Sequence, residues 1–317
     1  LAMISRFFVS ILFFLSFAYG GLLRAEEDAR VVFADALLSQ KPYLLTEADA
    51  LLGEFQKKNY SEQEAREWAK LLFELKAYPF IEKNDEGEER FRGEIFDFCS
   101  YSAEMGVGYI CAYYCAQNDK RNVRVTKLNE KIYDEPLLTY LIWKGKYRIL
   151  EILGKCGVLE YLWDIPDKHG NSPWVMAIDM DDAQAMKILA EAYRSCHPVN
   201  KEEKLFPKGV KDGKVLKINL LEYAVEKKKK NVLTPLICDL GFDPNEKLYT
   251  NGKAKGETVL HRAAYRRWPE GVERLLDLEA KNLPRDDGAR PCDVFRPRGK
   301  KSTPDEENVW VRLRMAN

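Results

Sequence analysis

Histidine is scarce in this chain, since only three occur among 317 residues. So few imidazoles leave little room for His-based acid–base catalysis or for His-rich metal sites. The chain also has no net charge, because 50 Lys and Arg side chains balance 50 Asp and Glu side chains. We therefore expect no nucleic-acid partner, because phosphate recognition needs concentrated basic side chains.

Short motifs with known chemistry are missing as well. The sequence contains no CxxC pair, P-loop, HExxH, GxGxxG or GxSxG, so it predicts no catalytic residue, cofactor or metal site. Its seven cysteines are an odd number and cannot all pair within one chain. A disulfide from Cys99 to Cys111 or Cys115 is one interpretation, and buried free thiols are the favoured one.

The N-terminus has the pattern of a secretory signal peptide. Arg6 precedes a twelve-residue apolar run, and small residues follow at Ala18 and Gly20, with a second cleavage pattern ending at Ala25. Residues 1–25 are therefore expected to direct export, giving a periplasmic or secreted protein without a membrane span in the mature chain. An uncleaved signal anchor is the alternative, because seventeen residues separate Arg6 from Arg24 and a spanning helix needs about 20.

Residues 26–133 are expected to form an irregular helical region of no recognisable family. Ser61 and Glu64 have the spacing of a capping box. They precede apolar residues at three-to-four spacing, beginning at Trp68, as in an amphipathic helix.

Internal repeats begin after residue 134. Four segments each place a small or apolar residue twelve positions before a leucine. The pairs are Leu141 with Leu153, Ala177 with Leu189, Ala224 with Leu236, and Ala263 with Leu275. A fifth segment, 290–295, has the pattern of a shortened end unit. Segments that recur in this way along the chain indicate a linear stack of helix pairs.

These segments resemble the ankyrin repeat, whose signature is T-P-L-H-x-A. The best match is Thr258-Val-Leu-His-Arg-Ala263, and 167–177, 240–245 and 287–294 match other parts of the repeat. The resemblance covers 134–298 and implies an all-α, ankyrin-like helical solenoid with a degenerate C-terminal cap. Residues 299–317 are expected as a C-terminal tail. The resemblance also implies that His261 links adjacent turns by hydrogen bonds.

Two insertions enlarge the spacing between units, at 194–214 and 246–255. In repeat arrays such insertions lie on one side, often the binding side. The sequence therefore predicts a non-enzymatic protein-interaction module. Such a module can act as a monomer. The candidate partner-binding residues are Tyr249, Asn251, Arg266, Arg267 and Trp268.

Other interpretations remain open at this point. An enzyme with its active site in the N-terminal helical region, and the repeats as a targeting arm, is the alternative function. A purely architectural partner in an envelope complex is a third. The acidic cluster Asp179, Asp181 and Asp182 is interpreted as a solvated turn rather than a cation site. The lysines at 227–230 are interpreted as the equivalent exposed turn of the next unit.

Overall fold

A computed structural model of the chain describes most residues after position 134 and part of the region before it. The residues it describes are 61–66, 69, 81–83, 89–97, 101–117, 123–126, 135–197, 205–211, 214–248, 255–297 and 303–316. The signal-peptide prediction for 1–25 lies outside these residues. None of the helices in the described part is both long enough and apolar enough to cross a bilayer.

The described chain is mostly helical, but the prediction of an all-α protein is wrong because it also contains six short strands. Four of them form one sheet at the start of the repeats, in the order β1-β2-β3-β4. Their bounds are β1 Ile81–Lys83, β2 Glu89–Arg92, β3 Arg124–Thr126 and β4 Glu135–Pro136. Strand β2 pairs antiparallel with β1 and parallel with β3, which pairs antiparallel with β4.

Alternating burial explains why these segments form strands rather than helices. Phe91 is buried between two less buried arginines, and Val123 and Val125 are buried two residues apart. The Phe91 ring lies 5.1 Å from the Tyr114 ring of α5 (Tyr101–Gln117), so the helix covers the sheet. The capping box is confirmed, since the Ser61 N–H donates to Glu64 and the Glu64 N–H donates to Ser61 Oγ.

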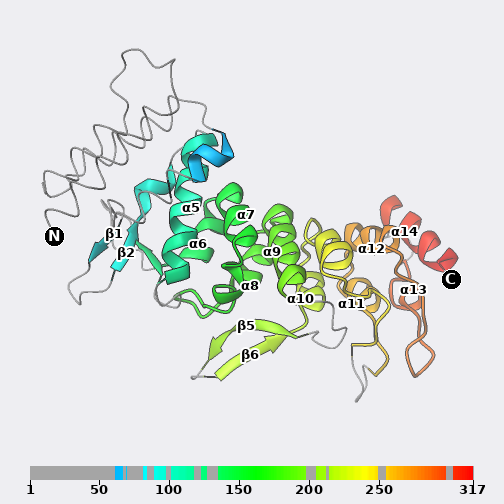
Figure 1. Cartoon of the computed structure of the whole chain (residues 1–317). Coiled ribbons are helices and arrows are strands. Elements are labelled where there is room, and N and C mark those ends of the chain that lie inside the picture. Colours follow the sequence, from blue (N-terminus) through cyan, green and yellow to red (C-terminus); the bar gives the residue numbers. More distant parts are fainter. Residues whose placement is uncertain are drawn as a thin grey trace, which may run out of the picture.

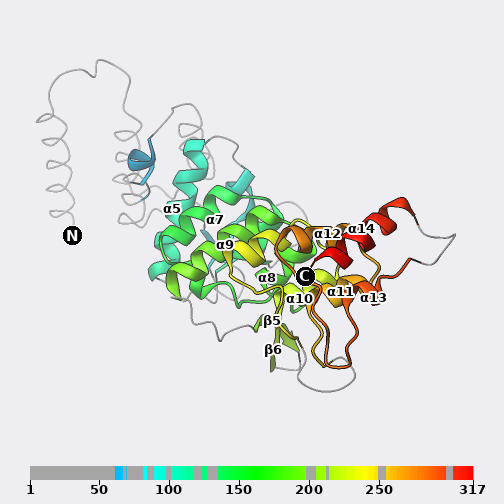
Figure 2. The same ribbon diagram turned by 90° about the vertical axis from the view of Figure 1, so that its right-hand side faces the viewer.

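Helices after residue 136 lie in two parallel rows (Figures 1 and 2). The first-helix row contains α6 Leu137–Trp143, α8 Pro173–Asp179, α10 Leu220–Glu226, α11 Val259–Tyr265 and α13 Pro291–Val294. The second-helix row contains α7 Tyr147–Lys155, α9 Ala183–Cys196, the π-helical turn η4 Pro235–Asp239, α12 Pro269–Asp277 and α14 Pro304–Met315. The short 3-10 helices η1 Gly93–Asp97 and η3 Leu159–Tyr161 connect other elements. Neighbouring first helices contact one another, as do α7 with α9 and α9 with η4.

The turn between the two helices of each unit has the same geometry four times. One residue takes a positive φ between 44° and 62°, and the next N–H donates back to a carbonyl at 2.9 to 3.2 Å. This is the Schellman ending of a helix. The accepting carbonyls belong to Leu141, Ala177, Ala224 and Ala263. These are the four residues on which the sequence segments align, so the predicted phase of the repeats is confirmed.

Polar side chains begin three of the first helices. Ser172 and Asn219 accept hydrogen bonds from the N–H groups of Val175 and Glu222, and Thr258 forms a capping box with His261. Each cap satisfies backbone donors that have no partner within the helix. The positions of these capping residues in the sequence therefore mark where the three helices begin.

The first insertion differs from the expected loop. Helix α9 continues through its beginning to Cys196, and β5 (Phe206–Lys211) pairs antiparallel with β6 (Lys214–Ile218). The Asp212-Gly213 dipeptide between the two strands is a common hairpin connection, and it is the sequence signal that would have predicted this hairpin.

The segment expected as a C-terminal tail contains α14. This helix packs against α12 and α13, with Val309 and Leu313 buried. The Trp310 Nε1–H group donates to the Cys292 carbonyl at 3.0 Å. The end of the stack is therefore covered by a helix of this chain.

Candidate protein-interaction site

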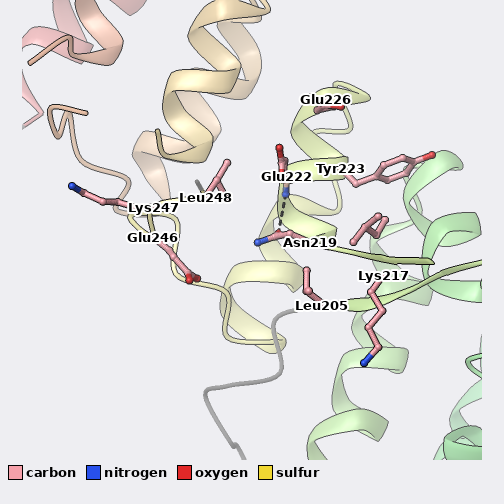
Figure 3. Close-up of a pocket in the computed structure, with 10 residues that line it drawn as sticks. Leu205, Lys217, Asn219, Glu222, Tyr223, Glu226, Glu246, Lys247 and Leu248 are labelled. Carbon is pink, nitrogen blue, oxygen red and sulfur yellow. Dashed lines mark hydrogen bonds between the residues drawn. The ribbon is translucent and has the colours of Figure 1, made fainter. Parts of the chain in front are cut away.

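A cleft of 470 Å³ opens over α10, between the β5–β6 hairpin and the start of the second insertion (Figure 3). We name it the α10 cleft. Its lining residues are Leu205, Lys217, Ile218, Asn219, Glu222, Tyr223, Glu226, Glu246, Lys247 and Leu248. Leu205 of the first insertion and the β6 residues that follow it supply one wall, the start of the second insertion supplies the other, and a first helix supplies the floor.

The floor of the α10 cleft is held in place by contacts with both neighbouring units. The Tyr223 hydroxyl donates to Asp179 Oδ1 at 3.1 Å, and burial together with this carboxylate raises the pKa of Tyr223 to about 12. On the other side, Arg262 lies 3.6 Å from Glu222 and 3.8 Å from Glu226. The floor is thus a fixed polar surface whose carboxylates already have cationic partners.

The hairpin wall is anchored by an aromatic cluster. Phe206 is buried, and its ring centroid lies 5.0 Å from those of Trp174 and Tyr193 and 5.9 Å from that of Phe242. Because Trp174 belongs to α8, the hairpin packs toward the preceding unit. Trp174 itself is completely buried.

The opposite wall is attached to the following unit instead. The Leu248 N–H donates to the Glu257 carbonyl at 2.7 Å, which closes the base of the second insertion. Lys247 and Lys255 form ion pairs with Asp286 at 2.9 and 3.0 Å, and both lower the pKa of that carboxyl group. One wall is therefore attached to the preceding repeat unit and the other wall to the following unit, and the α10 cleft opens between the two walls.

Among the predicted partner-binding residues that the structure describes, Arg266 lies accessible beside the α10 cleft. Its side chain is 50% exposed and lies 3.6 Å from Glu226 of the floor. A guanidinium group in this position can pair with a partner's carboxylate as well as with Glu226. Tyr249 and Asn251 follow Leu248 directly in sequence, but both lie outside the described residues.

Arg267 and Trp268 have internal roles instead. Arg267 occupies the positive-φ position of its turn, donates to the Arg296 carbonyl at 3.0 Å and pairs with Glu306. Trp268 is 6% exposed and packs directly over Gly271, where a Cβ atom would overlap the indole. The prediction of Trp268 as a surface anchor is wrong, because the small neighbour at 271 lets the ring fold onto α12.

The three aspartates of the 179–182 turn connect units rather than facing solvent alone. Asp181 accepts hydrogen bonds from the backbone and side-chain amides of Asn231, both at 2.9 Å. Asp182 caps α9 and accepts from the Tyr147 hydroxyl at 3.0 Å. Sequence inspection missed these links because the partners lie up to 51 positions away.

His261 is confirmed as the structural histidine of its repeat. Its Nδ1 accepts from the Thr258 N–H, and its Nε2–H donates to the Ala289 carbonyl of the next turn, each at 3.1 Å. This arrangement uses the neutral ring. Burial lowers the pKa of His261, so the ring has the character of a linker rather than of a proton carrier.

A smaller pocket of 160 Å³ lies in the two units that precede α10. It is bordered mainly by α6 and α8 and by the turn at 167–169. The pocket residues are Glu135, Thr139, Tyr140, Trp143, Asp167, Lys168, His169 and Met176. Its apolar lining and half-exposed Trp143 extend the surface available to a partner along the first-helix row.

The described segments were expected to hold no metal site and no Cys–His catalytic pair. No group of three or more His, Cys, Asp or Glu side chains with metal-binding geometry is found there. His197, next to Cys196, stacks on the Tyr193 ring at 4.5 Å instead of forming a catalytic pair. Cys111 and Cys292 are buried free thiols, whereas Cys99 lies outside the described residues.

Comparison with known proteins finds similarity only at the level of solved structures. No protein-family model and no curated protein matches the sequence. Among solved structures, the human ASB11 ankyrin repeat domain is similar, with a TM-score of 0.36 and 16% identity, over 79% of this chain and 96% of that domain.

Proposed function

We propose that this protein is an exported, non-enzymatic protein-interaction module built on ankyrin-like repeats at 134–298. The observation that carries the proposal is the α10 cleft, whose two walls are insertions held apart by contacts with opposite neighbours. Rigid walls and a fixed floor form a preorganised surface, which reduces the entropy lost on binding.

A protein is the partner class that this surface fits best. Half-exposed apolar side chains recur at the C-terminal ends of first helices, at Trp143, Met180 and Tyr265, and Leu205 adds another beside the α10 cleft. Apolar groups surrounded by charged ones are typical of interfaces that bury an apolar centre and keep a polar rim. Arg266, and Tyr249 and Asn251 from the second insertion, are proposed as further contacts.

Site-specific photocrosslinking of the full chain tests this surface. A benzoylphenylalanine is placed at Leu205 beside the α10 cleft or at Met180 at the end of α8, and at Lys187 of α9 as the matched control. All three positions are at least 42% exposed. We expect the same adduct from Leu205 and Met180, none from Lys187, and loss of both adducts when unlabelled protein is added. Adducts from Lys187 alone would place the partner on the second-helix row and contradict the proposed site.

Export rests on residues 1–25 and needs a separate test. Fractionation should find the full chain outside the cytoplasm, and a variant lacking 2–25 inside it. N-terminal sequencing of the exported protein should begin after Gly20 or Ala25. An intact N-terminus in a membrane fraction would favour the signal anchor instead.

A further inference from the structure

The smaller of the two pockets, which we name the α6–α8 pocket, is bordered by α6, by α8 and by the turn at 167–169. Its volume is 160 Å³. An apolar cavity of about 150 Å³ is large enough to hold one benzene molecule. The α6–α8 pocket therefore has room for a single aromatic side chain of a partner.

Charged groups at this pocket are already paired within the protein. Lys168 Nζ lies 2.9 Å from Glu135 Oε1, and Asp167 Oδ1 accepts from the N–H groups of His169 and Asn171, both at 2.8 Å. These contacts hold the turn beside β4 and give each of the two carboxylates a partner. A charged ligand would have to compete with one of these contacts, so the α6–α8 pocket favours a neutral ligand.

Two aromatic side chains of α6 form a corner at the pocket. The ring centroids of Tyr140 and Trp143 are 6.0 Å apart, and the ring planes meet at 73°. The Tyr140 hydroxyl donates to the Gly93 carbonyl at 3.4 Å, and Met176 adds an apolar side chain from α8. Lys144 Nζ lies 4.4 Å from the Trp143 ring centroid and covers one face of that ring. The half-exposed Trp143 can still pack against a further ring, as aromatic side chains prefer to do edge to face.

Thr139 contributes a hydroxyl group without a hydrogen bond. The residue lines the pocket and is 2% exposed, and its Oγ1 atom has no hydrogen-bond partner within the described part of the chain. Burial of a hydroxyl without a partner is unfavourable. A threonine in a helix populates two side-chain rotamers, so rotation about χ1 can present this hydroxyl to the pocket. A ligand with one polar atom would give Thr139 the hydrogen bond that it lacks.

We propose that the α6–α8 pocket binds a tyrosine side chain of the protein partner, with the phenol hydroxyl bonded to Thr139. A phenol matches the size of the pocket, its neutral apolar lining and its unpaired hydroxyl. Leucine or phenylalanine would leave Thr139 without a hydrogen bond, and the indole of tryptophan is larger than benzene. This inference rests on the proposed function, because it assigns a side chain of the same partner in the units that precede the α10 cleft.

Two side-chain analogues that differ by one hydroxyl, p-cresol and toluene, test this chemistry on the full chain. Binding is followed by the methyl resonance of Met176 in protein labelled at its methionine methyl groups, with the buried Met186 as the reference. The matched variant is Thr139→Val, which keeps the branched shape of the side chain and removes the hydroxyl. Thr139→Val should bind p-cresol about three- to tenfold more weakly than wild type does, and toluene no more weakly.

Thermal unfolding of Thr139→Val provides a second readout. The variant should melt no lower than wild type, because no hydrogen bond of Thr139 to another described residue is lost. A lower melting temperature would show that the hydroxyl already has a partner. That result, an unshifted Met176 resonance, or equal effects of the variant on both analogues would overturn the inference and leave the proposed function standing.

Crosslinking from Leu205 tests whether the phenol belongs to the partner. At partner concentrations below saturation, the yield of the adduct should fall at least about threefold in Thr139→Val and when excess p-cresol is added. An unchanged yield in both cases would assign the pocket to free phenols and overturn the inference, without affecting the proposed function. The absence of any adduct from Leu205 and Met180 in otherwise wild-type protein would count against both.

Discussion

One residue in each helix–helix turn must adopt a left-handed backbone, and four different residue types do so. Gly145 adopts it freely, whereas Asp181, Lys228 and Arg267 carry a Cβ that makes this conformation costly. Asp181 and Arg267 offset that cost with side-chain hydrogen bonds to the next unit. These turn residues therefore act in the stacking of units as well as in the turns themselves.

Replacing Asp181 with alanine should lower the free energy of unfolding by about 1–2 kcal/mol, because its hydrogen bonds to Asn231 and Val232 are lost. Urea denaturation measures the change. An Asp181→Asn variant keeps one acceptor oxygen and should lose less. Equal stability of wild type and the alanine variant would show that the link between these units is energetically neutral.

His261 makes stability dependent on pH in a defined direction. Burial lowers its pKa below 6.5, so the unfolded chain binds more protons than the folded chain in the window between the two values. The contribution is therefore present above pH 6.5 and is lost as the pH falls toward the folded pKa. Denaturant midpoints at about pH 7.5 and pH 5 should differ more for wild type than for His261→Gln. Identical differences in the two proteins would contradict this role.

At the scale of elements, Phe206 is the described side chain that anchors the hairpin to the helices. A two-stranded hairpin is marginally stable by itself, and Phe206 attaches this one to the aromatic cluster around Trp174 and Tyr193. The position of the hairpin is therefore determined by packing against α8 and α9 rather than by its own pairing.

Phe206→Ala should cost about 3–5 kcal/mol, the usual loss for a buried phenylalanine, if the hairpin unfolds together with the stack. Faster amide exchange in 206–218 would accompany the loss. Leu205→Ala is the matched control, because Leu205 is 49% exposed and its truncation should change stability by no more than about 0.5 kcal/mol. Unchanged exchange in Phe206→Ala would mean that strand pairing alone maintains the hairpin.

At the scale of the whole molecule, the stack needs a covered end. Helix α14 buries Val309 and Leu313 against α12 and α13, and the Asn282 N–H donates to the Ala316 carbonyl at 2.9 Å. Each repeat contacts mainly its neighbours, so an uncovered terminal unit would expose apolar surface to water.

A chain ending before Thr303 should melt at least about 5 °C lower, because the faces of α12 and α13 become exposed. Thermal unfolding followed by circular dichroism measures this shift. Met315→Ala is the control, because Met315 is 77% exposed and lies on the same helix. A truncated chain that melts at the wild-type temperature would show that α14 is dispensable.

Local chemistry determined the phase of the repeats from the sequence alone. The turn carbonyls at Ala177, Ala224 and Ala263, the caps at Ser172 and Asn219, and the hydrogen bond between Thr258 and His261 all follow from residue types at short spacing. Helix ends are governed by hydrogen bonds within a few residues, so the printed sequence is sufficient to find them.

Tertiary structure alone decided where the insertions lie and which side chains they leave exposed. Trp268 was expected at the surface and is buried on Gly271, and the strands between 81 and 136 were expected to be helical. The α10 cleft depends on Phe206 meeting Trp174 and on Lys247 meeting Asp286, 32 and 39 positions apart. Such contacts form between residues brought together by folding, and no short-range pattern specifies which distant side chain each will meet.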